Sequence, residues 1–176
     1  YVHDEYGLLT SLDSRKGEES ARSIKYTYDE FDRLIELDYG NGDIETRTYD
    51  SWGKLLTTQR GEDKEPYKYD YFGRLTSKIG TKEKLYIAYN PYGQRIGRKI
   101  ESNGVKMLER RTYDEYGRLI KISSGGKTLE YIYNDNNQIH QQIINGSIIE
   151  FTYTKYGQLK SKRMIKNNKT SEKKGM

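Results

Sequence analysis

The sequence has no cysteine, which excludes disulfide bonds and thiolate metal sites. It also has no apolar run near the roughly 20 residues that a membrane-spanning helix needs, and its first residues show no signal-peptide pattern. Only 33% of its 176 residues are hydrophobic, which is too little apolar material for a thick two-layer core. We therefore expect neither membrane insertion nor an ordinary globular core.

Aromatic residues are abundant instead. The chain contains 18 tyrosines, and aromatic residues make up 12% of it, whereas disordered chains are poor in aromatics. A thin sheet surfaced by tyrosine fits this composition better than disorder does.

A short motif recurs along almost the whole chain, and its best copies approach Tyr-Asp-x-x-Gly-Arg-Leu. The copies begin at His3, Tyr28, Tyr49, Tyr69, Tyr89, Tyr113, Tyr133 and Tyr153. The steps between these starts are 25, 21, 20, 20, 24, 20 and 20 residues. So regular a period is typical of a repeat architecture rather than of a domain built around one active site.

Each copy has the residue preferences of a type I turn. In Asp70-Tyr71-Phe72-Gly73, aspartate stands first, where its side chain can accept a backbone N–H, and glycine stands fourth, where it can adopt positive φ and form a bulge. Asp32 and Asn137 replace this glycine in two copies, and both residue types tolerate that conformation. Pro91 falls at the second turn position, where its fixed φ fits. The motif therefore predicts a hairpin.

A second series of turn signals, such as Asn41-Gly42, lies between the motif copies, so each repeat holds two strands and two turns. Leu129, Tyr131 and Tyr133 alternate onto one face, and no window shows a helical apolar stripe. The predicted fold is all-β. We expect an antiparallel meander of about eight 20-residue repeats, about 16 strands, over residues 1–165, curving or spiralling as part of a β-shell.

The two prolines test this assignment. Pro91 occupies a turn, as described above, and Pro66 is expected to stand immediately before a strand, where it removes no ladder hydrogen bond.

The net charge of +5 is concentrated at one end of the chain. Residues 160–176 hold seven Lys or Arg against one Glu, a net of +6, which leaves about −1 for residues 1–159. The period is lost after about residue 165, so residues 166–176 are predicted to form a basic polar tail, frayed or disordered. No specific nucleic-acid partner is expected. Binding of nucleic acid or an anionic surface through the tail is the weakest functional hypothesis.

The motif, its order and its period together resemble the YD repeats of RHS proteins. The match covers about residues 1–165 and is clearest at Tyr28–Leu34, Tyr69–Leu75 and Tyr113–Leu119. This family includes bacterial polymorphic toxins, shell components of insecticidal toxin complexes, wall-associated proteins and teneurins. The resemblance implies a long sheet that spirals into a hollow shell, which in the toxins encloses a C-terminal toxic domain.

One segment of the family's toxins is missing here. Those toxins end their shell with Asp-Pro-x-Gly, where an aspartate-dependent self-cleavage acts. Asn90-Pro91-Tyr92-Gly93 lacks the aspartate and is followed by further repeats, so we interpret it as an ordinary repeat turn. The resemblance therefore implies shell wall alone.

Catalysis is not expected. The aspartates Asp29, Asp50, Asp70 and Asp114 recur with equivalent neighbours, whereas a catalytic carboxylate pair needs two different environments. Each is predicted to cap its own turn. The only histidines, His3 and His140, have no metal-ligand spacing. We predict no enzymatic activity, no catalytic residues, no cofactor and no metal site.

The tyrosines leave two functional classes open. Pairs such as Tyr67 and Tyr69 are predicted to pack across strands, because a chain poor in aliphatic residues needs its aromatics inside. The same holds for Tyr26, Tyr28, Tyr131 and Tyr133. If some tyrosines face outward they can stack on sugar rings, and the alternative function is a carbohydrate-binding adhesion module that binds surface glycans.

The predicted function is a non-catalytic structural segment of a shell or surface scaffold in a secreted or surface-exposed bacterial RHS-type toxin. Its expected partners are flanking repeats and an enclosed C-terminal toxin domain of the same parent protein.

Overall fold

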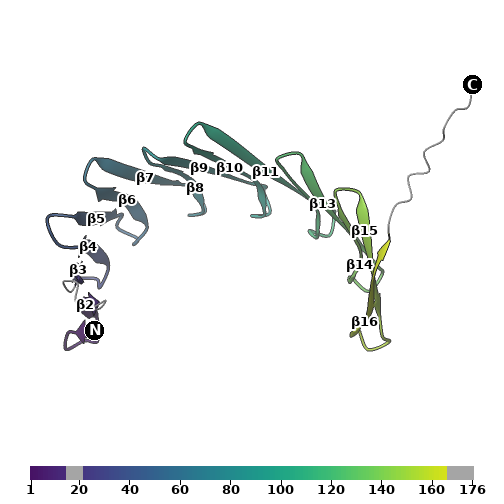
Figure 1. The fold of residues 1–176 in the computed structure, drawn as a ribbon, viewed down its shortest axis with the longest axis horizontal. Coiled ribbons are helices and arrows are strands. Elements are labelled where there is room, and N and C mark those ends of the chain that lie inside the picture. The colour runs from purple at the N-terminus through teal and green to yellow at the C-terminus, as the bar shows by residue number, and fades with distance from the viewer. Residues whose placement is uncertain (15–21, 166–176) are drawn as a thin grey trace, which may run out of the picture. The chain divides into compact units, whose positions relative to one another are not determined.

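A computed structural model of the chain describes residues 1–14 and 22–165, and within these residues all regular structure is β-strand. The predicted tail, residues 166–176, lies outside the described residues. Sixteen strands follow one another along the chain (Figure 1): β1 (Val2–His3), β2 (Leu9–Ser14), β3 (Arg22–Tyr28), β4 (Leu34–Asp38), β5 (Ile44–Tyr49), β6 (Leu55–Arg60), β7 (Asp63–Tyr69), β8 (Leu75–Ile79), β9 (Glu83–Tyr89), β10 (Arg95–Ser102), β11 (Val105–Tyr113), β12 (Leu119–Ser124), β13 (Lys127–Tyr133), β14 (Ile139–Ile144), β15 (Ser147–Tyr153) and β16 (Leu159–Ile165).

The strands form one open antiparallel meander, in which hydrogen-bonded neighbours are always consecutive in sequence. This confirms the predicted all-β fold and the predicted strand number. Where the chain is described, no helix has the length and apolar character to cross a membrane.

The chain divides into two compact units. Unit 1 comprises residues 1–86 and 100–105, and it holds β1 to β8 and most of β9. Unit 2 comprises residues 87–99 and the chain from 106 onward, and it holds β12 to β16 with most of β10 and β11.

Two kinds of turn alternate within each unit. The predicted motif turns close the hairpins that begin with an odd-numbered strand, such as β7–β8 and β13–β14, and shorter connecting turns join these hairpins to one another. Every second connection of a meander lies at the same end of the strands. All motif turns of one unit therefore lie side by side at one end of its strands. Six hairpins also shift register at the motif tyrosine, a bulge that the sequence did not predict: β3–β4, β5–β6, β7–β8, β11–β12, β13–β14 and β15–β16.

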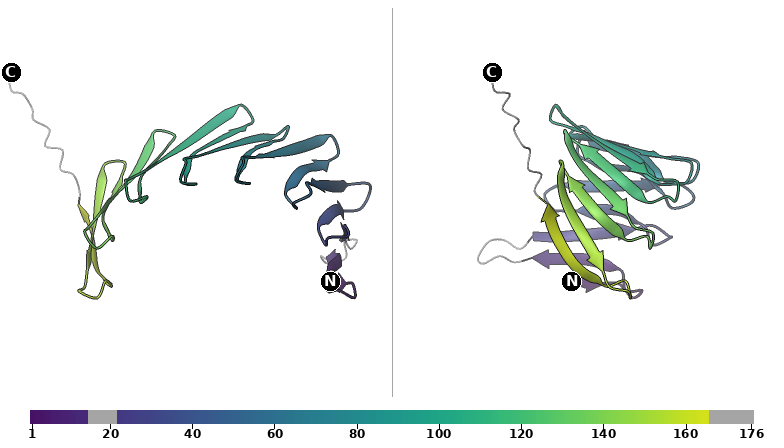
Figure 2. Two further views of the ribbon diagram at one scale, coloured as in Figure 1. Left: turned by 180° about the vertical axis from the view of Figure 1, so that it is seen from behind. Right: turned by 90° about the vertical axis from the view of Figure 1, so that its right-hand side faces the viewer.

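In each unit the described strands make a single layer, and no other described segment forms a second layer against either face (Figure 1 and Figure 2). Consequently the core is very small. Leu37 and Ile149 are the only hydrophobic side chains among the described residues that are truly buried, at 8% and 7% exposure. The register places Tyr131 of β13 beside Gln142 of β14, and Gln142 beside Ile149 of β15, so the face of unit 2 that holds the buried Ile149 also carries a tyrosine and a polar glutamine.

The position of Pro66 differs from the prediction. It lies inside β7 and pairs with Thr57 of β6. The tight β6–β7 turn makes Arg60 and Asp63 a hydrogen-bonded pair, and pairs alternate, so Pro66 falls at a non-hydrogen-bonded pair and its nitrogen points away from β6. The β7–β8 pairing begins only at Tyr67, so the proline nitrogen lies outside the paired stretch of these two strands.

Candidate functional site

Asp70 illustrates how every motif turn is built. Gly73 donates its N–H to the Asp70 carbonyl over 2.9 Å, and Asp70 donates its own N–H to the Arg74 carbonyl over 2.9 Å. Asp70 Oδ1 accepts the N–H groups of Phe72 and Arg74, each at 3.0 Å. Gly73 has φ of 78°. The sequence predicted one backbone N–H for this side chain, whereas the structure gives it two.

The replacements at the fourth turn position follow the prediction as well. Asp32 and Asn137 adopt φ of 60° and 61°, the left-handed values predicted for that position. The first position is equally consistent. An oxygen of its side chain accepts two backbone N–H groups in all eight turns, at Asp4, Asp29, Asp50, Asp70, Asn90, Asp114, Asn134 and Thr154.

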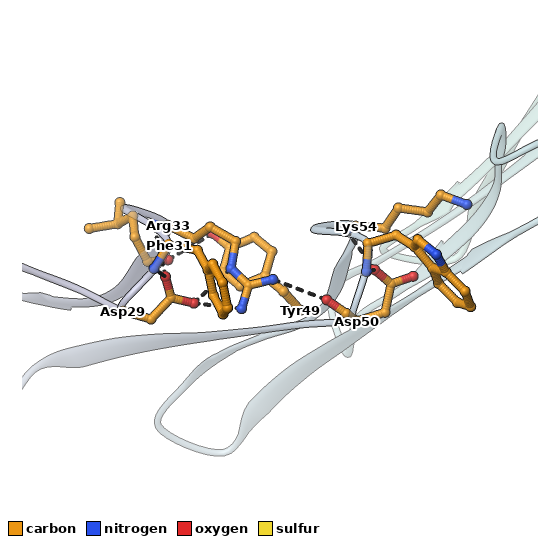
Figure 3. A network of polar contacts seen from close by, with 8 residues as sticks. Asp29, Phe31, Arg33, Tyr49, Asp50 and Lys54 are labelled. Carbon is orange, nitrogen blue, oxygen red and sulfur yellow. Dashed lines mark hydrogen bonds and ion pairs between the residues drawn. The ribbon is translucent and has the colours of Figure 1, made fainter.

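The arginine that follows the turn joins one repeat to the next (Figure 3). Arg33 Nε donates to Asp29 Oδ2 over 2.7 Å, and Arg33 Nη2 lies 2.6 Å from the same oxygen. Arg33 Nη1 then donates to the carbonyl of Asp50 in the next motif turn over 3.0 Å. The guanidinium also lies over the rings of Phe31 and Tyr49, at 5.1 and 5.0 Å from their centroids. Such planar stacking suits arginine better than lysine.

Unit 2 contains the same bridge in Asp114–Arg118. Arg118 Nε donates to Asp114 Oδ2 over 2.7 Å, and its Nη1 donates to Asn137 Oδ1 of the next motif turn over 3.0 Å. Its guanidinium lies 5.1 Å from the ring centroid of Tyr116 and 4.6 Å from that of Tyr133.

Two other copies make an uncharged version of this bridge. Asn90 donates an amide N–H to Gln94 Oε1 over 2.8 Å, and Gln94 Nε2 donates to the Gly117 carbonyl of the next motif turn over 2.7 Å. Asn134 and Gln138 repeat the arrangement, with Gln138 Nε2 donating to the Gly157 carbonyl over 3.0 Å. Aspartate is thus paired with arginine in three of the five aspartate copies, and asparagine is paired with glutamine in both asparagine copies. This pairing is visible in the sequence, but the sequence analysis missed it.

The motif tyrosine makes a second contact between repeats. The Tyr69 hydroxyl donates to the carbonyl of Leu55, the first residue of β6, over 2.8 Å. The β6–β7 register starts at Thr57 paired with Pro66, so Leu55 lies beyond that ladder and the hydroxyl takes the place of a ladder donor. The same bond forms in five other repeats, from Tyr28, Tyr49, Tyr113, Tyr133 and Tyr153. The sequence predicted packing for these tyrosines but not this bond.

The general expectation that the aromatics lie inside does not hold at the motif turns, although none of the tyrosines named for cross-strand packing is among the exposed residues. The third residue of the motif turn is aromatic in seven of eight copies, and all seven side chains are strongly exposed rather than inside. Their exposures run from 67% for Phe31 to 88% for Tyr92. The reason is the single layer, because residues at a turn beyond the last strand pair have no second sheet to cover them. We call these seven the third-position aromatics: Tyr6, Phe31, Trp52, Phe72, Tyr92, Tyr116 and Tyr156.

The aspartates considered as catalytic groups bind their own turns, and the two histidines belong to different units. Asp29, Asp50, Asp70 and Asp114 each bind their own turn, as described above. His3 and His140 are exposed and lie in different units. Within residues 1–14 and 22–165, no three His, Cys, Asp or Glu side chains gather as metal ligands.

The two versions of the bridge give a testable prediction. We expect the single substitutions Asp29→Asn and Arg33→Gln each to lower the urea midpoint of unfolding. Each breaks the charged bridge and leaves the remaining charged side chain without its charged partner. The double variant restores the Asn–Gln pairing of residues 90 and 94, so its midpoint should lie closer to wild type than that of either single variant. Additive losses in this double-mutant cycle would contradict the equivalence of the two bridges.

The charged bridge and the uncharged bridge should also differ in how stability depends on pH. Partial burial, which raises the pKa of Asp29, is outweighed by hydrogen bonds from the Arg33 N–H, the Arg33 side chain and the Phe31 N–H, so this pKa lies below its ordinary value of 3.8. A carboxyl whose pKa is lower when folded contributes stability above about pH 4 and loses it as pH falls through the folded pKa. The double variant should therefore lose less stability than wild type between about pH 5 and about pH 2.

Comparison with known proteins identifies the fold. No family model matches the chain, and no curated protein matches it. Among solved structures, it is similar to the crystal structure of TcdB2-TccC3-Cdc42, with a TM-score of 0.62 and 15% identity over 93% of this chain. TcdB2-TccC3 without its hypervariable C-terminal region gives 0.62 and 14% over 90%, and TcdB2-TccC3 gives 0.61 and 15% over 90%.

The chain spans about 10% of the length of each of these proteins. At such low identity the likeness establishes a shared fold. The fold shared with the TcdB2-TccC3 chains agrees with the resemblance to RHS proteins inferred from the repeated motif.

Proposed function

We propose that this chain is a non-catalytic stretch of wall in an RHS-type shell of a secreted or surface-exposed bacterial toxin. The observation that carries the proposal is the contact between repeats. Within each unit, the motif arginine or glutamine and the motif tyrosine bind the neighbouring repeat, while almost no side chain is deeply buried. A repeat held in this way is stabilised by the neighbouring repeats rather than by a core. Such a sheet can therefore be extended by adding further repeats. The likeness of fold to TcdB2-TccC3 supports the proposal.

The proposed partners are flanking YD repeats and an enclosed toxin domain of the same parent protein. Among the described residues, β16 has β15 as its only neighbour, and most of its side chains are exposed. Its outer edge therefore offers unpaired backbone groups to another strand, which in a shell would belong to the next repeat.

The 176-residue chain is therefore expected to self-associate through its edge strands. Sedimentation should show an average mass that rises with concentration over a hundredfold range. Lys160 and Lys162 on β16 repel an identical edge, so added salt should strengthen the association by screening them. A monomer at every concentration, with amides of both β1 and β16 protected from exchange, would mean that the edges are already closed and would contradict a shell segment.

A further inference from the structure

The third-position aromatics have no role in closing their turns. The turn at Asn134 has Asn136 at the third position, yet it keeps the same bonds: Asn137 donates its N–H to the Asn134 carbonyl over 3.0 Å, as Gly117 does to Asp114. An exposed aromatic side chain is costly to leave in water, since each can bury roughly 150 to 250 Å². Seven such residues at one turn position therefore indicate a surface that is covered by a partner.

The arginine bridge fixes several of these rings in place. In unit 2, the Arg118 guanidinium lies 5.1 Å from the centroid of the Tyr116 ring, which is nevertheless 76% exposed. Arg33 and Arg74 lie equally close to Phe31 and Phe72 in unit 1. A ring supported in this way loses little entropy when a ligand stacks on it.

Two grooves lie between successive motif turns of unit 2, and Tyr116 lines both. The first, of about 640 Å³, lies among Tyr92, Tyr113 and Tyr116, with Asn90, Gln94 and Arg111 as polar neighbours. The second, of about 490 Å³, is lined by Tyr116, Tyr133, Arg118, Asn134, Asp135 and Asn137. Each volume is within the range of roughly 300 to 1,000 Å³ that small-molecule sites occupy.

The composition of the grooves specifies the ligand chemistry. The first groove has one arginine, Arg111, against two carboxylates, Asp114 and Glu115, and the second has Arg118 against Asp135. Neither carries the positive excess that a phosphate or sulfate chain requires. Aromatic rings beside amides and carboxylates suit an uncharged ligand with flat apolar faces and a rim of hydroxyl groups, because the rings take the faces and the polar groups take the hydroxyls.

Spacing specifies the form of the ligand. Successive motif turns of a unit are separated by two strands, or roughly 10 Å. The grooves therefore repeat along the row of motif turns at the ends of the strands. A repeating surface is best filled by a repeating ligand, whose linked units bind several weak sites together. We propose that the third-position aromatics of unit 2 bind a neutral linear polysaccharide, with sugar rings stacked on Tyr92 and Tyr116. This goes beyond the scaffold role and is independent of it.

Isothermal titration calorimetry of the full chain with cellohexaose and chitohexaose tests the proposal. We expect at least one of these neutral hexasaccharides to bind, with an affinity unchanged by added salt. Tyr116→Ala should weaken binding about tenfold, because Tyr116 serves both grooves. The matched control is Tyr1→Ala, which removes an 84% exposed tyrosine from outside the motif turns and should have no effect. Asn136→Tyr, which completes the row, should tighten binding a few fold.

Other results would overturn the proposal. These are absence of binding to either oligosaccharide, equal loss in the Tyr116 and Tyr1 variants, and preference for a heparin hexasaccharide that disappears in high salt. Selective binding to phosphatidylcholine vesicles would likewise show that the aromatics serve a lipid surface. Urea titration of each variant separates lost binding from lost folding. Since shell assembly is measured by sedimentation, a failure here leaves the scaffold proposal standing.

Discussion

Leu37→Ala is expected to lower the free energy of unfolding by about 2 to 3 kcal/mol, near the low end of the range for buried leucines. Leu37 lies on β4 between Tyr26 of β3 and Glu45 of β5, and only 8% of it is exposed. A single-layer sheet has few such positions, so the loss of one removes a large share of the apolar burial in unit 1. Urea unfolding followed by circular dichroism measures the effect.

Leu56→Ala is the matched control, because Leu56 lies on β6 of the same unit but is 40% exposed. Its expected cost is below about 1 kcal/mol, in proportion to the smaller area that it buries. Equal losses at Leu37 and Leu56 would mean that burial on this sheet does not determine stability.

Gly53→Val is expected to cost about 1 to 3 kcal/mol, because a β-branched residue is strained at positive φ. Gly53 stands fourth in its motif turn with φ of 83°, and a Cβ added there would meet no atom within 4 Å. The cost would therefore come from the backbone alone. Gly73 is a less clean position, since its added Cβ would lie 2.9 Å from Lys54 Nζ.

Asp32→Gly is the reciprocal change at the same turn position, where Asp32 already adopts φ of 60°. Glycine relieves this strain but makes the unfolded chain more flexible, so we expect a change within about 0.5 kcal/mol of zero. Both variants can be measured in one urea series. Similar losses from Gly53→Val and Asp32→Gly would refute the positive-φ assignment of the fourth position.

The paired bridges explain how the motif varies without loss of the fold. An Asp–Arg pair and an Asn–Gln pair play the same two parts, because the first residue caps its own turn and the second donates to a carbonyl of the next turn. A change of only one member places a charge beside a neutral amide. We therefore expect repeats of this kind to tolerate the two substitutions together better than either one alone.

Local chemistry alone determined the turns and the strands. A type I turn involves only four consecutive residues, and its geometry favours Asp at the first position and Gly, Asp or Asn at the fourth. The alternation of Leu129, Tyr131 and Tyr133 is likewise a property of one strand. The sequence therefore predicted the all-β meander, its strand number and the conformations of Asp32 and Asn137.

Tertiary structure decided what depends on the neighbouring strand. The hydroxyl of Tyr69 meets Leu55 across the β6–β7 pair, and Arg33 meets Asp50 beside the β4–β5 pair, so both contacts depend on how neighbouring strands are aligned. Pro66 is accepted inside β7 because the β6–β7 alignment places it at a non-hydrogen-bonded pair. The exposure of the third-position aromatics also required the structure, since hydrophobicity predicts burial only where a second layer exists to bury against, and the described residues form none.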